Sequence, residues 1–236
     1  MKERKFYEIR NQAESEPAQI FIYDQIGPSF WDEGVEAKTF VKELAEIEAG
    51  EIHLHINSPG GSVFDGQAIH TALKNHPANV TVFIDGLAAS IATIIALAGD
   101  SVVMAPNALF MIHNPWGWAE GDADELRKYA DMLDKIRGTL IATYVEKTGL
   151  AEDQVAAMLD SETWLNANEA LEHGFIDLIS EDQLEAAAMV PAFAKAAPDL
   201  AALGFKNAPS ELPQITAAAE EEETEEEETE EEETEE

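Results

Sequence analysis

Apolar residues recur along the chain with two periods, one typical of strands and one typical of helices. Every second residue is apolar over 18–23 and 51–56, so each of these runs predicts a strand. Spacings of three and four residues predict a long amphipathic helix over 122–147. Further strands are predicted over 80–84, 101–104, 108–112 and 175–179, and further helices over 34–47, 64–75, 90–98, 151–159 and 166–173. Because strands alternate with helices, the pattern favours parallel pairing and an α/β fold.

The same pattern divides the chain into four parts. We predict a weakly ordered N-terminal arm over 1–18, where residues are mixed and polar, and a folded domain over 19–180. Residues 181–219 form an extension rich in alanine and proline. The tail over 220–236 holds 14 Glu and 3 Thr in a short repeat. A segment of such charge repels itself, so we predict that the tail is disordered.

Composition excludes several classes of protein. The chain has no cysteine, which excludes a disulfide framework, thiolate catalysis and a cysteine-based zinc site. Its charged start lacks a following apolar region, and its longest apolar stretch, 87–98, is too short to cross a bilayer. The net charge is −34, and the chain outside the tail is still acidic. We therefore expect a cytoplasmic protein that binds neither nucleic acid nor membrane.

One serine stands between a predicted strand and a predicted helix, in the stretch Asp85-Gly86-Leu87-Ala88-Ala89-Ser90-Ile91. A hydroxyl at such a turn lies at the edge of a sheet beside the positive end of a helix, which suits a nucleophile. Serine is also a common helix N-cap, and small residues let a helix pack closely on a sheet. Taken alone, the stretch favours the N-cap.

A second stretch, Asn57-Ser58-Pro59-Gly60-Gly61, follows a predicted strand and opens a helix. Paired glycines there permit unusual backbone angles and expose N–H groups, as in an anion or oxyanion site. A phosphate loop is a weaker interpretation, because no Lys-Ser or Lys-Thr pair follows. A tight turn without any site is the commonest use of such a sequence.

His113 ends the apolar run Phe110-Met111-Ile112 and precedes a turn. A histidine at the end of a core strand can act as a general base, although a lone histidine is more often a hydrogen-bonded surface residue. If Ser90 needs a base, His113 is the best placed. The residues Asp160 and Glu162 both offer a carboxylate that could orient its ring.

Four blocks together resemble the proteolytic subunit of the Clp protease family, ClpP. They occur in the family's order and spacing, and the resemblance covers about residues 19–180. Four ordered blocks are far more specific than any single motif. The blocks are Ile56–Gly61, Gly86–Ser90, Met111–Pro115 and Trp164–Ala170.

The resemblance implies a spiral of β-β-α units, a fold that the family shares with the crotonases. It also implies a serine endopeptidase that needs no metal and no other cofactor. Ser90 is similar to the family's nucleophile and His113 to its general base. The backbone N–H groups of Gly61 and Ile91 match the family's oxyanion hole. Crotonases lack the Ser-His pair, so its presence favours a protease over an acyl-CoA enzyme.

The acid departs from the family pattern. The family has an aspartate at the position that falls on Glu162, counted back from the block that starts at Trp164. Glutamate is one methylene longer and can still orient an imidazole. Asp160 remains the rival acid.

A Clp-like domain followed by a foreign C-terminal extension resembles the head-maturation (prohead) proteases of tailed bacteriophages. The protein's substrates would then be capsid or scaffold proteins, inside an assembling shell in the host cytoplasm. The helix over 122–147 resembles the family's helix that joins rings, which implies a homo-oligomeric ring. Two alternatives stay open: a Clp subunit that works with an AAA+ unfoldase, and a catalytically silent scaffold protein.

Overall fold

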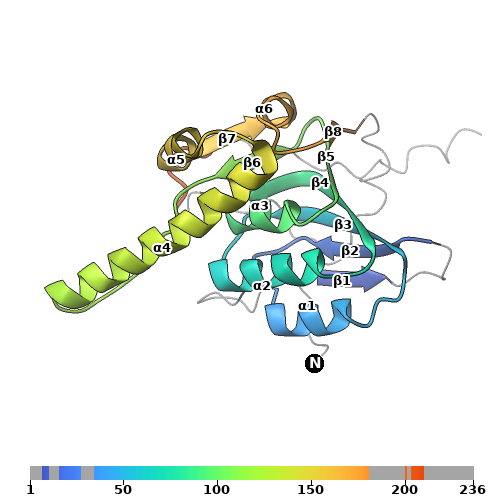
Figure 1. The fold of residues 1–236 in the computed structure, drawn as a ribbon, viewed down its shortest axis with the longest axis horizontal. Coiled ribbons are helices and arrows are strands. Elements are labelled where there is room, and N and C mark those ends of the chain that lie inside the picture. The colour runs from blue at the N-terminus through green and yellow to red at the C-terminus, as the bar shows by residue number, and fades with distance from the viewer. Residues whose placement is uncertain (1–6, 11–15, 28–34, 181–199, 201–202, 210–236) are drawn as a thin grey trace, which may run out of the picture.

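A mixed sheet of eight strands organises the part of the chain that the computed structural model describes, namely residues 7–10, 16–27, 35–180, 200 and 203–209 (Figure 1). Most neighbours pair in parallel, from β2 through β3, β4 and β5 to β8, and β6 also pairs in parallel with β4. The two antiparallel pairs are β1 with β2 and β6 with β7. The strands are β1 (Tyr7–Arg10), β2 (Ala18–Ile22), β3 (Glu51–Ser58), β4 (Asn79–Ala89), β5 (Ser101–Met104), β6 (Leu109–Ile112), β7 (Thr163–Asn166) and β8 (Leu178–Ile179).

Helices form two groups around this sheet (Figure 1). The first group is α1 (Ala37–Leu44), α2 (Val63–Lys74) and α3 (Ile91–Ala96), in which α2 contacts both neighbours. The second group is α4 (Ala123–Thr148), α5 (Glu152–Asp160) and α6 (Ala167–Glu172). Within it, α5 and α6 contact β7, and α4 contacts α5 and α3.

The long helix α4 is buried only toward its C-terminal end. Leu140, Ile141 and Tyr144 pack into the core, whereas the N-terminal half projects from the body of the fold (Figure 1). Leu126 and Met132 in that half are 44% and 38% exposed. No helix within the described residues is long and apolar enough to span a membrane.

The α/β class is confirmed, and most predicted elements are found within a few residues of their expected bounds. The expected end of the third strand at Ile84 is wrong, because β4 continues to Ala89. Its first half pairs with β5 and its second half with β6, so the small residues Ala88 and Ala89 are fully buried within the sheet.

Two strands lie where none was predicted. The expected weakly ordered arm contains β1, whose pairing with β2 and whose buried Tyr7 give it a place in the sheet. The segment just before the predicted helix over 166–173 forms β7, which pairs with β6. The predicted disordered tail lies outside the described residues, as does most of the extension, of which Leu200 and residues 203–209 are described.

Candidate active site

Ser90 follows β4 directly and has an unusual backbone conformation, with φ 56° and ψ −130°. Positive φ is rare for a residue with a side chain and costs on the order of 1–3 kcal/mol, so the surrounding structure must hold it. The N–H of Ser90 donates to the carbonyl oxygen of Met111 on β6 at 2.9 Å. Its hydroxyl does not cap α3, so the N-cap interpretation is wrong for the side chain.

The hydroxyl of Ser90 instead meets His113, with Oγ 2.8 Å from Nε2. Parallel pairing between β4 and β6 explains this contact, because both residues come directly after neighbouring strands that end at one edge. A neutral ring that carries its proton on Nδ1 leaves Nε2 to accept the hydroxyl proton. The structure thus brings together a hydroxyl and a base in the arrangement that nucleophilic catalysis requires.

Gly60 places the loop after β3 against Ser90, and Gly61 packs against Ile26. Gly60 has φ 88°, and a Cβ added there would lie 2.6 Å from the carbonyl oxygen of Ala89 and 3.1 Å from the nitrogen of Ile91. Gly61 has φ 144° and is exposed, and it forms a bridge with Ile26. The hydrogen bonds of that bridge run through the oxygen of Gly60 and the nitrogen of Ser62. They leave the N–H of Gly61 outside this pairing.

Sequence reasoning missed a buried support beneath Ser90. The hydroxyl of Thr93 donates to the carbonyl oxygen of Ser90 at 2.5 Å and lies 2.6 Å from the hydroxyl of Tyr144. Both side chains are buried, and burial raises the pKa of Tyr144, so its hydroxyl stays protonated and able to donate. This series of hydrogen bonds connects the backbone of Ser90 to α4. No local signal reveals it, because the two residues are far apart in sequence.

Glu162 lies between α5 and β7 with φ 48° and is 8% exposed. Its carboxylate accepts three hydrogen bonds: from the indole of Trp164 at 3.3 Å and from the backbone N–H groups of Lys206 and Asn207 at 2.9 and 2.6 Å. Burial raises the pKa of this carboxyl, but the hydrogen bonds and the nearby His113 outweigh it and leave the pKa below its ordinary value. Within the described residues, the carboxylate forms no hydrogen bond with His113.

The rival acid, Asp160, is exposed and has hydrogen-bond partners other than His113. Its side chain is 61% exposed and accepts hydrogen bonds from Asn114 at 2.8 Å and from Arg137 at 3.0 Å. Those two bonds lower its pKa, the bond from Asn114 most. Of the two carboxylates, Glu162 is therefore the one placed beside the Ser-His pair.

Burial also sets the charge of His113. Desolvation lowers the pKa of its ring, and the cation of Lys206 lowers it further, while the anion of Glu162 opposes both. The net shift is downward, so the ring stays neutral at pH 7. A neutral ring is the form that can accept a proton from Ser90.

We therefore predict that His113 takes up its proton only below the ordinary histidine pKa of about 6.5. Histidine labelled with ¹³C in the ring allows this titration to be followed by NMR, and His113→Gln identifies the signal among the six histidines. Lys206→Gln removes a cation and should move the midpoint upward. A midpoint at or above the ordinary value would contradict the environment described for this ring.

A different histidine, the buried His55, stabilises the sheet. The ring of His55 is stacked between Phe21 and Phe83, with centroids 4.8 and 5.0 Å away. Its nitrogens meet Asp85 at 2.9 Å and Gln19 at 3.1 Å. These contacts satisfy both nitrogens, and the described structure places no nucleophilic serine, threonine or cysteine beside them.

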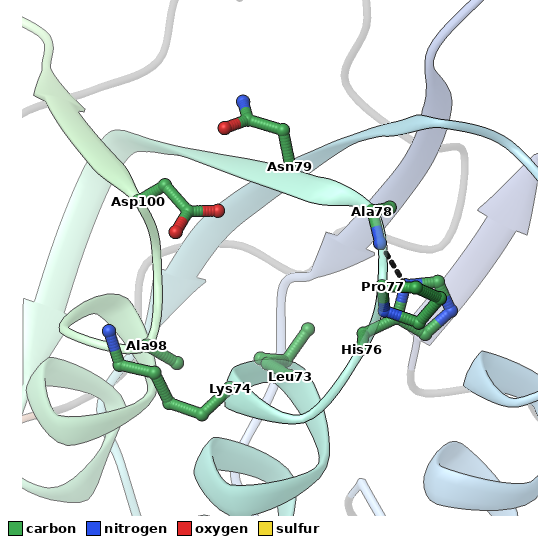
Figure 2. A pocket seen from close by; sticks show the side chains of 8 residues that line it. All are labelled: Leu73, Lys74, His76, Pro77, Ala78, Asn79, Ala98 and Asp100. Atoms are coloured by element: carbon green, nitrogen blue, oxygen red, sulfur yellow. Dashed lines mark hydrogen bonds between the residues drawn. The ribbon is translucent and has the colours of Figure 1, made fainter.

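A hollow of about 320 Å³ lies away from Ser90, between the end of α2 and the starts of β4 and β5 (Figure 2). Two of the residues that line it are hydrogen-bonded to each other: the N–H of Ala78 donates to Nδ1 of His76 at 3.2 Å. The hollow contains none of the predicted site residues. Among the described residues, no group of three or more histidine and carboxylate side chains could hold a metal.

Comparisons with known proteins agree on one family. The model of the Clp protease family matches residues 1–183. The ATP-dependent Clp protease proteolytic subunit 1 of Leifsonia xyli is 36% identical over 142 residues, which are 59% of this chain and 72% of the relative. A proteolytic subunit from Streptococcus pneumoniae is 37% identical over 139 residues, covering 57% of this chain and 71% of the relative. A ClpP1 mutant from Listeria monocytogenes has a similar fold, with TM-score 0.61 and 29% identity, over 70% of this chain and 91% of that one.

Proposed function

Because the chain belongs to the Clp protease family, we propose that Ser90, His113 and Glu162 are the catalytic triad of this serine endopeptidase. The observation that carries the proposal is the 2.8 Å contact between Ser90 Oγ and His113 Nε2, made by a serine in a strained conformation. Strain of this kind is retained where it positions a reactive group.

In the proposed reaction, Nε2 of His113 takes the hydroxyl proton while Oγ of Ser90 attacks a peptide carbonyl. The N–H groups of Gly61 and Ile91 donate to the developing oxyanion, and each such donor is worth about 3 kcal/mol. The protonated ring then gives its proton to the leaving amine. Water, activated by the same ring, hydrolyses the acyl group from Ser90.

The biological role that we propose is cleavage of capsid or scaffold proteins during phage head maturation. Its support is the region after the catalytic domain: residues 184–236 lie outside the match to the Clp protease family and end in the acidic tail. The alternative is a Clp subunit that works with an AAA+ unfoldase. The relatives' description as ATP-dependent proteolytic subunits favours that alternative.

We also propose a homo-oligomeric ring. Leu126 and Met132 on the projecting half of α4, together with Trp118 before it, are large apolar side chains left exposed in the single chain. Such groups are commonly covered in an assembly. The mass of the purified chain by light scattering tests this: a multiple of the 25.8 kDa chain mass supports a ring, and a monomer contradicts it.

Coexpression with a capsid protein encoded near this chain's gene tests the role in head maturation. We expect the parent chain to shorten the capsid protein at defined sites, and Ser90→Ala to leave it intact. The alternative is favoured if an AAA+ unfoldase captures the chain only in the presence of nucleotide and the capsid protein stays uncut.

A further inference from the structure

The C-terminal segment Leu203–Pro209 lies against the candidate active site. The ring of Phe205 is 5.4 Å from the ring of His113 and 5.7 Å from the indole of Trp164, centroid to centroid. The site thus has an aromatic contact from a segment that is distant in sequence. Apolar residues of the segment and Leu200 join one cluster with residues of β4, β6 and β7: Leu87, Ala89, Leu109, Met111, Trp164, Leu200, Leu203, Phe205 and Ala208.

The backbone of the same segment binds the proposed acid. The N–H of Lys206 donates to Oε2 of Glu162 and the N–H of Asn207 donates to Oε1, so each carboxylate oxygen has a backbone partner. The side-chain amide of Asn207 also donates to the carbonyl oxygen of Ser161 at 2.9 Å. Hydrogen bonds to a charged acceptor are among the stronger ones in proteins.

The carboxylate of Glu162 lies near the ring of His113 but is hydrogen-bonded to the segment and not to the ring. In a working triad the carboxylate accepts a hydrogen bond from the second nitrogen of the histidine ring and holds the ring in the productive tautomer. Here the ring of His113 contacts Ser90 through Nε2, while the described structure shows no hydrogen bond between that ring and Glu162. The ring meets Phe205 instead.

We propose that Leu203–Pro209 is an intramolecular ligand of the active site that keeps the protease latent. The segment covers the ring of His113 with Phe205 and competes with that ring for the carboxylate of Glu162. The inference rests on the proposed triad. Trp164 and His113 then form the surface that the segment occupies. This surface fits a peptide that presents an aromatic side chain next to free backbone N–H groups.

Release of the segment should raise activity. In the full chain, Asn207→Pro removes the backbone N–H that binds Glu162, because proline has none. Asn207→Ala is its matched control: both changes lose the bond to Ser161, but alanine keeps the backbone N–H. Phe205→Ala removes the ring that covers His113. We expect about tenfold faster labelling of Ser90 by a fluorophosphonate in Asn207→Pro and Phe205→Ala than in Asn207→Ala and the parent.

Two further experiments test whether the faster labelling of Ser90 depends on Glu162 and on the segment. In a Glu162→Gln background, Asn207→Pro should give no gain, since the carboxylate that the segment withholds is absent. A synthetic peptide with the sequence of residues 200–209 should slow the labelling of Phe205→Ala, and the same peptide with alanine in place of its phenylalanine should not.

The outcomes separate this inference from the proposed function. Equal labelling of Ser90 in the parent and all variants, or slower labelling in Asn207→Pro, would show that the segment is incidental or supports the site, and would overturn the latency. Absence of labelling and of peptide hydrolysis in every chain would reject the proposed triad and the inference with it.

Discussion

Ser90→Ala is expected to lower the hydrolysis of a fluorogenic peptide by about 10⁴-fold or more. The reason is geometric: Oγ is the group that meets Nε2 of His113 at 2.8 Å, and alanine offers no other nucleophile at that place. The fold should persist, because alanine keeps the Cβ and the hydroxyl caps no helix. The rate should be measured in the full chain and again with Phe205→Ala, where the starting activity is expected to be higher.

Ser101→Ala provides the control. This serine is also partly buried and starts β5, a neighbour of β4, but lies outside the candidate site. It should keep the activity of the parent. If Ser90→Ala hydrolyses the peptide at a tenth of the parent rate or more, Ser90 is not the nucleophile.

Gly60→Ala is expected to lower kcat/KM by about 10²-fold, because oxyanion donors lose their effect when they are misplaced by about 1 Å. An added Cβ would lie 2.6 Å from the carbonyl oxygen of Ala89 and 2.7 Å from Cβ of Ser90, so the loop must move. The positive φ of 88° adds strain of roughly 1–3 kcal/mol for any residue with a side chain.

Gly50→Ala is a matched control, because its added Cβ would meet no atom within 4 Å. Circular dichroism and thermal unfolding separate lost catalysis from lost folding. If Gly60→Ala is folded and as active as the parent, the loop after β3 does not form the oxyanion site.

Periodicity predicted the fold class, and the resemblance of four ordered blocks to the Clp protease family predicted the Ser-His pair. Alternation of apolar residues identified β3 and the first half of β4, and four ordered motif blocks indicated Ser90 and His113 before any contact was known. The structure places the two side chains in contact because parallel strands carry them to one edge. Periodicity was sufficient for the elements because it depends on residues that are close in sequence, and each block was recognised from a short run of residues.

Other features depended on contacts between distant segments. The second half of β4 has no strand pattern of its own, and it is a strand because β6 pairs with it. Counting back from the block at Trp164 pointed to Glu162 but left Asp160 as a rival, and the fold distinguishes the two by burying Glu162 and leaving Asp160 in solvent. The contact of Leu203–Pro209 with the site, like the contact of Thr93 with Tyr144, follows from tertiary packing alone.

Mapping of the covalent adduct tests the central claim most directly. The full chain and Phe205→Ala are treated with a fluorophosphonate, digested, and examined by mass spectrometry for the modified residue. We predict one adduct, on Ser90, that is lost with His113→Ala. An adduct on a different residue, or hydrolysis of peptides by a chain whose Ser90 stays unmodified, would contradict the assignment of Ser90 and His113 as the nucleophile and its base.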